Sequence, residues 1–250
     1  MPDPAITRHA RHLALPQVGA DGQERIGASS ALLIGAGGIG CSAASYLAAS
    51  GVGHLVICDF DSVDATNLGR QILYGPDDVG QPKAEVAARR LGIINPDIEI
   101  SAIANRLDDA ELRNQVAAAD IVLDGCDNFA TRFQVNDACV EQSTCLVSGA
   151  AIRLEGQVAE FGPDYETSPC YRCFYKEADE SLENCAGNGV LSPVPGVIGG
   201  LMAVEALKFL AGIESQRGVL RLFDGVSGEF RAVRVEKRSD CPACSSLRPQ

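Results

Sequence analysis

The chain has 250 residues, and its 33 acidic and 21 basic side chains give a formal net charge of −12. Hydrophobic residues make up 46% of the chain, which is enough to bury a large core and argues against intrinsic disorder. Because nucleic-acid phosphates and anionic membranes would repel so negative a protein, we expect no nucleic-acid partner and no membrane partner.

The polar N-terminal segment and the most apolar segment of the chain both argue for a cytoplasmic protein. Residues 1–15 mix charged and polar side chains and lack the apolar stretch of a signal peptide. The most apolar long segment, 196–212, contains Glu205 and Lys208 and is shorter than the ~20 residues of a membrane span. In a reducing compartment, metal binding or catalysis explains any paired cysteines among the ten better than disulfides do.

In the first 150 residues, short apolar runs alternate with longer segments compatible with helices, the pattern of βαβ units and a parallel sheet. The predicted strands are residues 31–34, 54–58, 98–104, 121–123 and 145–148. One predicted helix follows the glycine-rich segment 35–40 and ends near Ser50, and the others are residues 83–91, 108–118 and 131–141.

The pattern changes after residue 150. Three segments are predicted to be antiparallel strands, namely residues 157–161, 219–223 and 230–236, the last two joined at Asp224-Gly225. The acidic stretch 176–195, rich in Gly and Pro, is predicted to be a mobile loop, and Pro195 is placed first in a helix that ends at Gly212. We predict one α/β domain over residues 1–250, with a Rossmann-like, mostly parallel nucleotide-binding half (1–150) continued by an antiparallel half (151–250).

Gly35, Gly37 and Gly40 fit the pattern G-x-G-x-x-G between a predicted strand and a predicted helix. Asp59 follows the last of them by nineteen positions and ends the next strand. Such glycines let backbone N–H groups approach phosphate, and the acid can bind ribose hydroxyls. The alternative is that the glycines only allow a helix and a strand to pack closely. Taken alone, the motif suggests NAD.

Two cations that follow the motif favour a nucleoside triphosphate over NAD. Arg70 lies shortly after the ribose-binding acid, and Lys83 starts the next predicted helix. Each of them alone could instead be a solvated surface cation. Asp127, directly after a buried strand, could hold Mg²⁺ or could equally cap the following helix, and Asn128 could add a polar contact.

Two C-x-x-C pairs lie in the second half of the chain and are separated by 67 residues. Four thiolates suit the tetrahedral coordination of structural zinc, so we predict that Cys170, Cys173, Cys241 and Cys244 bind Zn²⁺ and clamp the C-terminal tail onto the body. Redox chemistry of the thioredoxin type is the rival for either pair alone.

Six other cysteines remain, and five of them fall in predicted helices and strands or beside a strand end, as small buried hydrophobic residues do. These five are Cys41, Cys58, Cys126, Cys139 and Cys145. Cys185 differs because it lies in the predicted loop. It could be reactive there or a tolerated surface residue, and the neighbouring Glu183 disfavours its thiolate.

These residues together make the chain resemble the ThiF/MoeB family of bacterial E1-like enzymes from about residue 8 to residue 244. The matching pieces are Arg8-x-x-Arg11, the glycine segment 35–40, Asp59-Phe60-Asp61, Asn67-x-x-Arg70-Gln71, Gln81-Pro82-Lys83, Asp127-Asn128, both C-x-x-C pairs and Cys185 before Ala186-Gly187. The segment 147–157 looks more like the molybdopterin-synthase adenylyltransferase branch than the thiazole branch.

The resemblance implies ATP-dependent adenylation of the C-terminal glycine of a ubiquitin-like sulfur carrier of the MoaD or ThiS kind, which ends in Gly-Gly and docks on the half 151–250. It implies that Gly38 and Asp59 bind the nucleotide, Arg70 and Lys83 contact phosphates and Asp127 handles Mg²⁺. It further implies a homodimer in which Arg11 reaches the partner's ATP, a sulfurtransferase or cysteine desulfurase as a further partner, and thiol chemistry at Cys185 in some branches.

The chain departs from the family pattern at three places. The family often shows Asp-Cys-Thr-Asp-Asn where this chain has Asp124-Gly125-Cys126-Asp127-Asn128, and Gly69 and His12 each replace a frequent glutamine. The charged residues all remain, so we expect adjusted geometry with activity kept. An NAD-dependent oxidoreductase, a zinc-stabilised docking protein without catalysis and a tRNA-modifying dehydratase are the alternatives.

Overall fold

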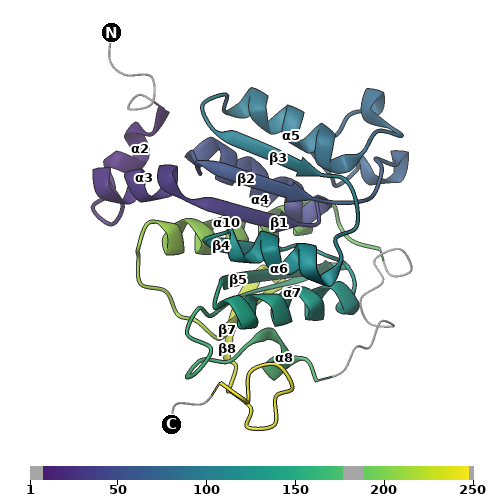
Figure 1. The fold of residues 1–250 in the computed structure, drawn as a ribbon. Helices are drawn as coiled ribbons and strands as arrows, with labels where there is room; N and C mark the ends of the chain where they lie inside the picture. Colours follow the sequence, from purple (N-terminus) through teal and green to yellow (C-terminus); the bar gives the residue numbers. More distant parts are fainter. Residues whose placement is uncertain (1–7, 177–188, 248–250) are drawn as a thin grey trace.

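The computed structural model describes residues 8–176 and 189–247, which form one eight-stranded mixed sheet with helices on both faces (Figure 1). The strand order is β3-β2-β1-β4-β5-β6-β7-β8. Pairing is parallel from β3 to β5 and antiparallel from β5 to β8. The strands are β1 (Ser30–Ile34), β2 (His54–Cys58), β3 (Glu99–Ile103), β4 (Ile121–Asp124), β5 (Cys145–Ile152), β6 (Glu155–Phe161), β7 (Val219–Asp224) and β8 (Glu229–Arg234).

The helices form two layers, with α4, α5 and α10 on one face of the sheet and α6 and α7 on the other (Figure 1). The α-helices are α2 (Ala10–Leu13), α3 (Gly19–Ala28), α4 (Gly38–Ser50), α5 (Lys83–Ile94), α6 (Asp109–Ala117), α7 (Phe129–Gln142), α8 (Tyr171–Phe174) and α10 (Pro193–Leu210). Two short 3₁₀ helices, η1 (Ala65–Asn67) and η2 (Pro76–Asp78), lie between β2 and α5.

The parallel strands are buried on both faces, which explains why they read as continuous apolar runs. Along β1, Leu33 belongs to the core cluster beneath α4, α5 and α10, whereas Leu32 and Ile34 belong to the cluster beneath α6 and α7. The predicted α/β fold with a parallel sheet continued by antiparallel strands is confirmed.

Several predicted boundaries were wrong. Strand β5 continues to Ile152, four residues beyond the predicted end, because Gly149 leaves room for α10 to cross it: a Cβ there would lie 2.3 Å from Met202 Sδ. Helix α10 begins at Pro193, two residues before the predicted start, and α5 extends to Ile94. Strand β8 ends at Arg234, and α2 and α3 were not predicted.

The five cysteines predicted to be core residues are all buried. Helix α10 is the one described helix long and apolar enough to pass for a membrane span, but half of it is buried in the fold, where it packs against α4 and β5. A helix in a protein core can be as long and as apolar as a membrane span. Most of the predicted mobile loop, residues 177–188 with Cys185, lies outside the described residues, so that prediction and the role of Cys185 stay untested.

Candidate functional site

A cavity of about 490 Å³ opens at the carboxyl ends of β1, β2 and β4 and continues along β5 to β8. Strand β1 lies between β2 and β4, so the strand order runs outward from β1 in both directions across the sheet. In α/β folds, ligands bind at the carboxyl ends of the strands at such a switch point. The sequence-predicted residues that line the cavity are Gly35, Gly37, Gly38, Asp59, Asp61, Arg70, Gln71, Lys83 and Asp127.

The glycines of the motif have different local roles. Gly35 has a φ of +91°, a left-handed conformation that glycine adopts without strain. Gly40 allows close packing, because a Cβ there would lie 1.9 Å from the Gly35 carbonyl oxygen. Gly37 and Gly38 line the cavity where α4 begins, so the N–H groups at this helix end can face an anion. The packing alternative thus explains Gly40, but it does not explain the whole motif.

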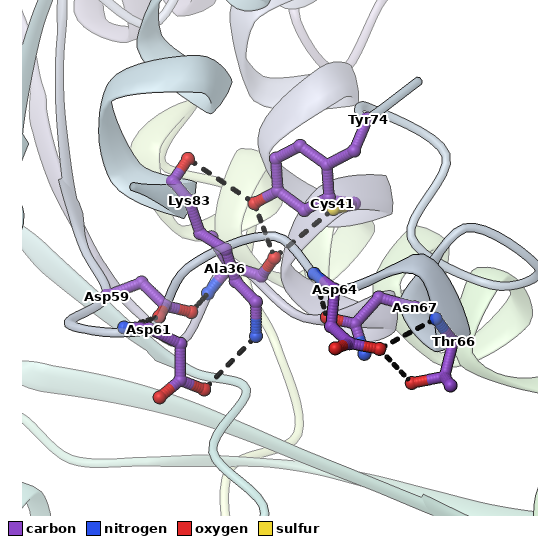
Figure 2. Close-up of polar contacts among 9 residues, drawn as sticks. All are labelled: Ala36, Cys41, Asp59, Asp61, Asp64, Thr66, Asn67, Tyr74 and Lys83. Carbon is purple, nitrogen blue, oxygen red and sulfur yellow. Dashed lines mark hydrogen bonds and ion pairs between the residues drawn. The ribbon is translucent and has the colours of Figure 1, made fainter. Parts of the chain in front are cut away.

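Asp59 follows β2 and lies against the glycine loop (Figure 2). Its Oδ2 accepts a hydrogen bond from Ala36 N at 2.7 Å, and its Oδ1 accepts one from Asp61 N at 2.9 Å. Burial raises the pKa of Asp59, and the positive charge of Lys83 and the two hydrogen bonds oppose that rise only in part. The structure therefore holds this carboxylate in a fixed orientation at the cavity wall.

This raised pKa predicts a pH dependence of nucleoside binding. An ionised Asp59 is predicted to accept hydrogen bonds from ribose hydroxyls, and as the pH falls through its raised pKa the carboxylate gains a proton and loses that capacity. The affinity for adenosine, which has no titrating phosphate, should therefore fall at a higher pH than an ordinary aspartate would cause. Calorimetric titrations between about pH 4 and pH 7 check this. Asp59→Asn should bind adenosine more weakly and lack the pH-dependent step; the same step in that variant would contradict the assignment.

Lys83 and Arg70 both line the cavity and bring positive charge to it. The side chain of Lys83 is 8% exposed, and its Nζ lies 3.1 Å from Asp61 Oδ2 (Figure 2). Arg70 follows η1 and donates a hydrogen bond to the Thr66 carbonyl oxygen at 3.0 Å. The two cations are thus held by local contacts on a cavity wall, the placement that a polyphosphate requires.

Gln71 provides a further sign that a polar ligand belongs here. It is 4% exposed and lines the cavity, and its Oε1 accepts no hydrogen bond from the described residues. Because a buried acceptor without a donor costs free energy, a ligand with N–H or O–H groups would satisfy it. The adenine amino group and the ribose hydroxyls of a nucleotide are such donors.

The structure places two of the predicted residues differently. The Asn67 Oδ1 accepts a hydrogen bond from Asp64 N at 3.2 Å, so this side chain caps the N-terminus of η1 (Figure 2). Asn67 is not among the cavity-lining residues. The Asn128 side chain caps α7 by accepting a hydrogen bond from Thr131 N at 2.9 Å. Since Asn128 fills the capping role, the exposed Asp127 at the cavity is available for Mg²⁺.

Sequence reasoning missed Arg132, which lines the cavity from α7 with 3% of its side chain exposed. Its Nη1 lies 3.7 Å from Asp124 Oδ2, and its Nη2 donates hydrogen bonds to the carbonyl oxygens of Cys126 and Gly149. Arg132 thus joins the end of β4 and the residues that follow it to Gly149 within β5. An arginine on the apolar side of a predicted helix, facing an aspartate that ends an apolar strand, was the available signal.

The far end of the cavity was also missed. Its walls come from β5 to β8, where small residues are followed by a charged rim. The small residues are Ala150, Ala151 and Gly156, and the rim residues are Glu155, Asp224, Glu229 and Arg231. These positions are far from the glycine motif in sequence, so only the sheet order could have placed them beside it.

The four predicted metal ligands meet at one point. Their Sγ atoms all lie within 4.8 Å of one another and are buried, with Cys170 and Cys241 3.6 Å apart and Cys173 and Cys244 3.5 Å apart. A tetrahedral zinc site with Zn–S bonds of 2.3 Å has sulfurs about 3.8 Å apart, whereas a disulfide needs about 2.05 Å. The donor set fits a closed structural zinc site that joins the C-terminal tail to α8 (Figure 1).

The comparison with protein-family models finds a match to the ThiF family over residues 9–243. The chain belongs to the ThiF family. It is 44% identical over 244 residues to the sulfur carrier protein ThiS adenylyltransferase of Escherichia coli (strain K12), which covers 98% of this chain and 97% of that protein. It is 42% identical over 243 residues to the molybdopterin-synthase adenylyltransferase of the same strain, with 97% of both chains covered.

A solved structure of E. coli MccB with AMPCPP and MccA resembles this ThiF-family chain with a TM-score of 0.82 at 25% identity. The match covers 96% of this chain and 74% of MccB. The identities of 44% and 42% to the two adenylyltransferases are too similar to separate the thiazole and molybdopterin branches. The sequence-based preference for the molybdopterin branch therefore stays a prediction.

The departures from the ThiF-family pattern are compatible with the geometry of the site. A Cβ at Gly69 would meet no atom within 4 Å, and the glycine has no left-handed φ, so neither space nor backbone conformation requires glycine there. Gly125 lines the cavity, and Cys126 is buried. His12 Nδ1 lies 2.9 Å from Gln23 Oε1, which fixes α2 on α3.

Proposed function

We propose that this ThiF-family chain adenylates the C-terminal glycine of a ubiquitin-like sulfur carrier with ATP and releases pyrophosphate. The observation that carries the proposal is the cavity itself, in which Arg70, Lys83 and Asp127 lie at the glycine-loop end and the other end extends along β5 to β8. Relatives at 44% and 42% identity are named adenylyltransferases of ThiS and of molybdopterin synthase. The products would serve sulfur transfer in thiamine or molybdopterin synthesis, in the cytoplasm.

The chemistry requires cations more than a nucleophile. A carboxylate that attacks the α-phosphorus of ATP brings two anions together, so the protein must position them and stabilise the charge that spreads over the phosphoryl oxygens. Lys83 and Arg70 supply positive charge at the cavity wall, and Asp59, which also lines the cavity, would hold the ribose. Asp127 would hold Mg²⁺, which when bound neutralises phosphate charge.

The far end of the cavity suits the tail of a carrier. Ala150 and Ala151 are the small residues of this wall, beside Ile152, Leu222 and Phe223, and a tail without side chains, such as a terminal Gly-Gly, would fit along it. The charged rim beyond them faces the carrier's folded body in this proposal. A sulfurtransferase or a cysteine desulfurase is the expected next partner of the adenylated carrier.

An exchange assay tests the proposal directly. The chain should catalyse exchange of pyrophosphate into ATP only when a carrier ending in Gly-Gly is present, and a panel of MoaD-like and ThiS-like carriers should identify the cognate one. A carrier that lacks its last glycine is the control. Failure of every cognate carrier to support exchange, or tighter binding of NADH than of ATP, would overturn the proposal.

We infer further that the active form is a homodimer in which Arg11 serves the partner's site. Arg11 lies on α2, is exposed, and is not among the residues that line the cavity of its own chain. Tyr46 of α4 and Val204 of α10 are 60% and 51% exposed, and these packed helices offer apolar surface for an interface.

Mixing two inactive variants tests this arrangement. Arg11→Ala damages the site of the partner, whereas Lys83→Met damages its own, so a mixed dimer has one intact site and one doubly damaged site. After subunit exchange at equal amounts, exchange activity should return to about a quarter of the wild-type value. The unmixed variants are the controls. If the mixture remains as inactive as they are, Arg11 does not act across the interface.

A further inference from the structure

The peptide groups on both sides of Ala36, inside the glycine loop, are held by side chains from three different segments (Figure 2). Ala36 N donates to Asp59 Oδ2 at 2.7 Å. Its carbonyl oxygen accepts hydrogen bonds from the Tyr74 hydroxyl at 2.8 Å and from Cys41 Sγ at 3.3 Å. Three side chains thus fix the backbone of Ala36, although Ala36 itself does not line the cavity.

Orientation of the Ala36 carbonyl determines where the next N–H group points. In a trans peptide the carbonyl oxygen of one residue and the N–H of the following residue point in opposite directions. Because the Ala36 oxygen is directed at Tyr74 and Cys41 in the core, the Gly37 N–H is directed away from that core. Gly37 lines the cavity, so this N–H is aimed at the side where the nucleotide is proposed to lie.

Tyr74 also contacts helix α5, which begins at Lys83. Its hydroxyl lies 3.4 Å from the carbonyl oxygen of Lys83, the first residue of α5 (Figure 2). The side chain is buried, at 6% exposure, and burial raises the pKa of Tyr74, so the hydroxyl keeps its proton. A single hydroxyl therefore touches carbonyl groups from the glycine loop and from the start of the lysine helix.

We propose that Tyr74 is a positioning residue, whose hydroxyl orients the Ala36–Gly37 peptide toward the nucleotide phosphates and couples the glycine loop to Lys83. Tyr74 acts through these groups and does not line the cavity. The inference rests on the nucleotide site proposed above. A buried tyrosine hydroxyl could also serve stability alone, so the test must separate the two roles.

The chain contains a matched control for that purpose. Tyr165 is 2% exposed, and its hydroxyl lies 2.9 Å and 3.4 Å from the carbonyl oxygens of Thr144 and Phe161. These contacts nearly equal those of Tyr74, at 2.8 Å and 3.4 Å. Tyr165 belongs to the core cluster on the other face of the sheet and does not line the cavity. Tyr165→Phe thus loses the same chemical group far from the nucleotide.

The experiment compares Tyr74→Phe with Tyr165→Phe in the full-length protein. Both variants keep the aromatic ring, and their melting temperatures should fall by similar amounts. For Tyr74→Phe we expect the KM for ATP and the Kd for ATP to rise about five- to tenfold, with the KM for the carrier within about twofold and the Kd for adenosine little changed. Tyr165→Phe should change none of these binding constants.

The outcomes also distinguish this inference from the nucleotide site on which it rests. Lys83→Met, measured in parallel, should weaken ATP binding. If Lys83→Met leaves the Kd for ATP unchanged, the nucleotide site itself is wrong. If Lys83→Met weakens ATP binding but Tyr74→Phe behaves like Tyr165→Phe, or weakens adenosine as much as ATP, the role of Tyr74 is wrong and the site stands.

Discussion

Replacing Lys83 by methionine is expected to lower carrier-dependent ATP–pyrophosphate exchange by about 10²- to 10³-fold, the usual effect of removing one group that stabilises charge in the transition state. The Lys83 side chain is 8% exposed and lies on the cavity wall, where water screens its charge less than at an open surface. Methionine keeps most of the length and apolar volume of the side chain. The loss should therefore report charge and not packing.

Lys208→Met is the matched control for that experiment. Lys208 lies near the end of α10, and its Nζ is 2.8 Å from Glu205 Oε2, so it also loses an ion pair with a carboxylate. It does not line the cavity, and exchange should stay within about twofold of wild type. Equal losses in the two variants would show that charge at Lys83 has no special role.

The ion pair between Lys83 and Asp61 bears on whether Lys83→Met disturbs the local fold. Asp61 compensates the charge of Lys83 at 3.1 Å, and the backbone N–H of Lys83 donates to the Asp61 carbonyl oxygen at 2.9 Å. The segment after β2 and the start of α5 are thus tied by both main chain and side chain. Lys83→Met leaves the backbone contact intact, so the local fold should survive the substitution.

The parallel half of the fold could be predicted from the sequence because its strands are short apolar runs that end at polar residues. β1, β2 and β4 are buried on both faces and lead directly into Gly35, Asp59 and Gly125. Helices α2 and α3 could not be predicted in this way. In α2 no residue is buried, and in α3 only Gly22 and Ile26 are, and neither helix has the side-chain N-cap that marks the start of α6.

In the candidate site, too, residues marked by the local sequence could be predicted, whereas residues that depend on contacts between distant elements could not. The glycine loop, Asp59 and Lys83 follow strand ends that the sequence marks locally, and they line the cavity as expected. The roles of Arg132 and Tyr74 depend on contacts with other elements: Arg132 reaches Gly149 in β5, and Tyr74 reaches Ala36 in the glycine loop. Such contacts depend on the packing of helices against the sheet, which a single sequence does not specify at the level of individual hydrogen bonds.

Loss of the zinc ion that we predict at the four clustered cysteines is expected to have the largest effect on stability. Cys241→Ser should release zinc and lower the free energy of unfolding by about 5 kcal/mol or more, because binding of a structural metal contributes directly to folding. The melting temperature should fall by about 10 °C or more. Scanning calorimetry and metal analysis measure the two effects, and wild type should hold about one zinc ion per chain.

Cys139→Ala provides the comparison, since Cys139 is equally buried, in α7, but is not one of the four clustered thiols. It should keep its zinc and lose about 1 kcal/mol, the cost of a small cavity. The Lys237 Nζ donates to the Cys244 carbonyl oxygen at 2.9 Å, and the Arg238 N donates to Cys173 Sγ, so the tail is already fixed around the thiols by its own hydrogen bonds. A Cys241→Ser protein that melts like Cys139→Ala would mean that these bonds, and not a metal, hold the tail to α8.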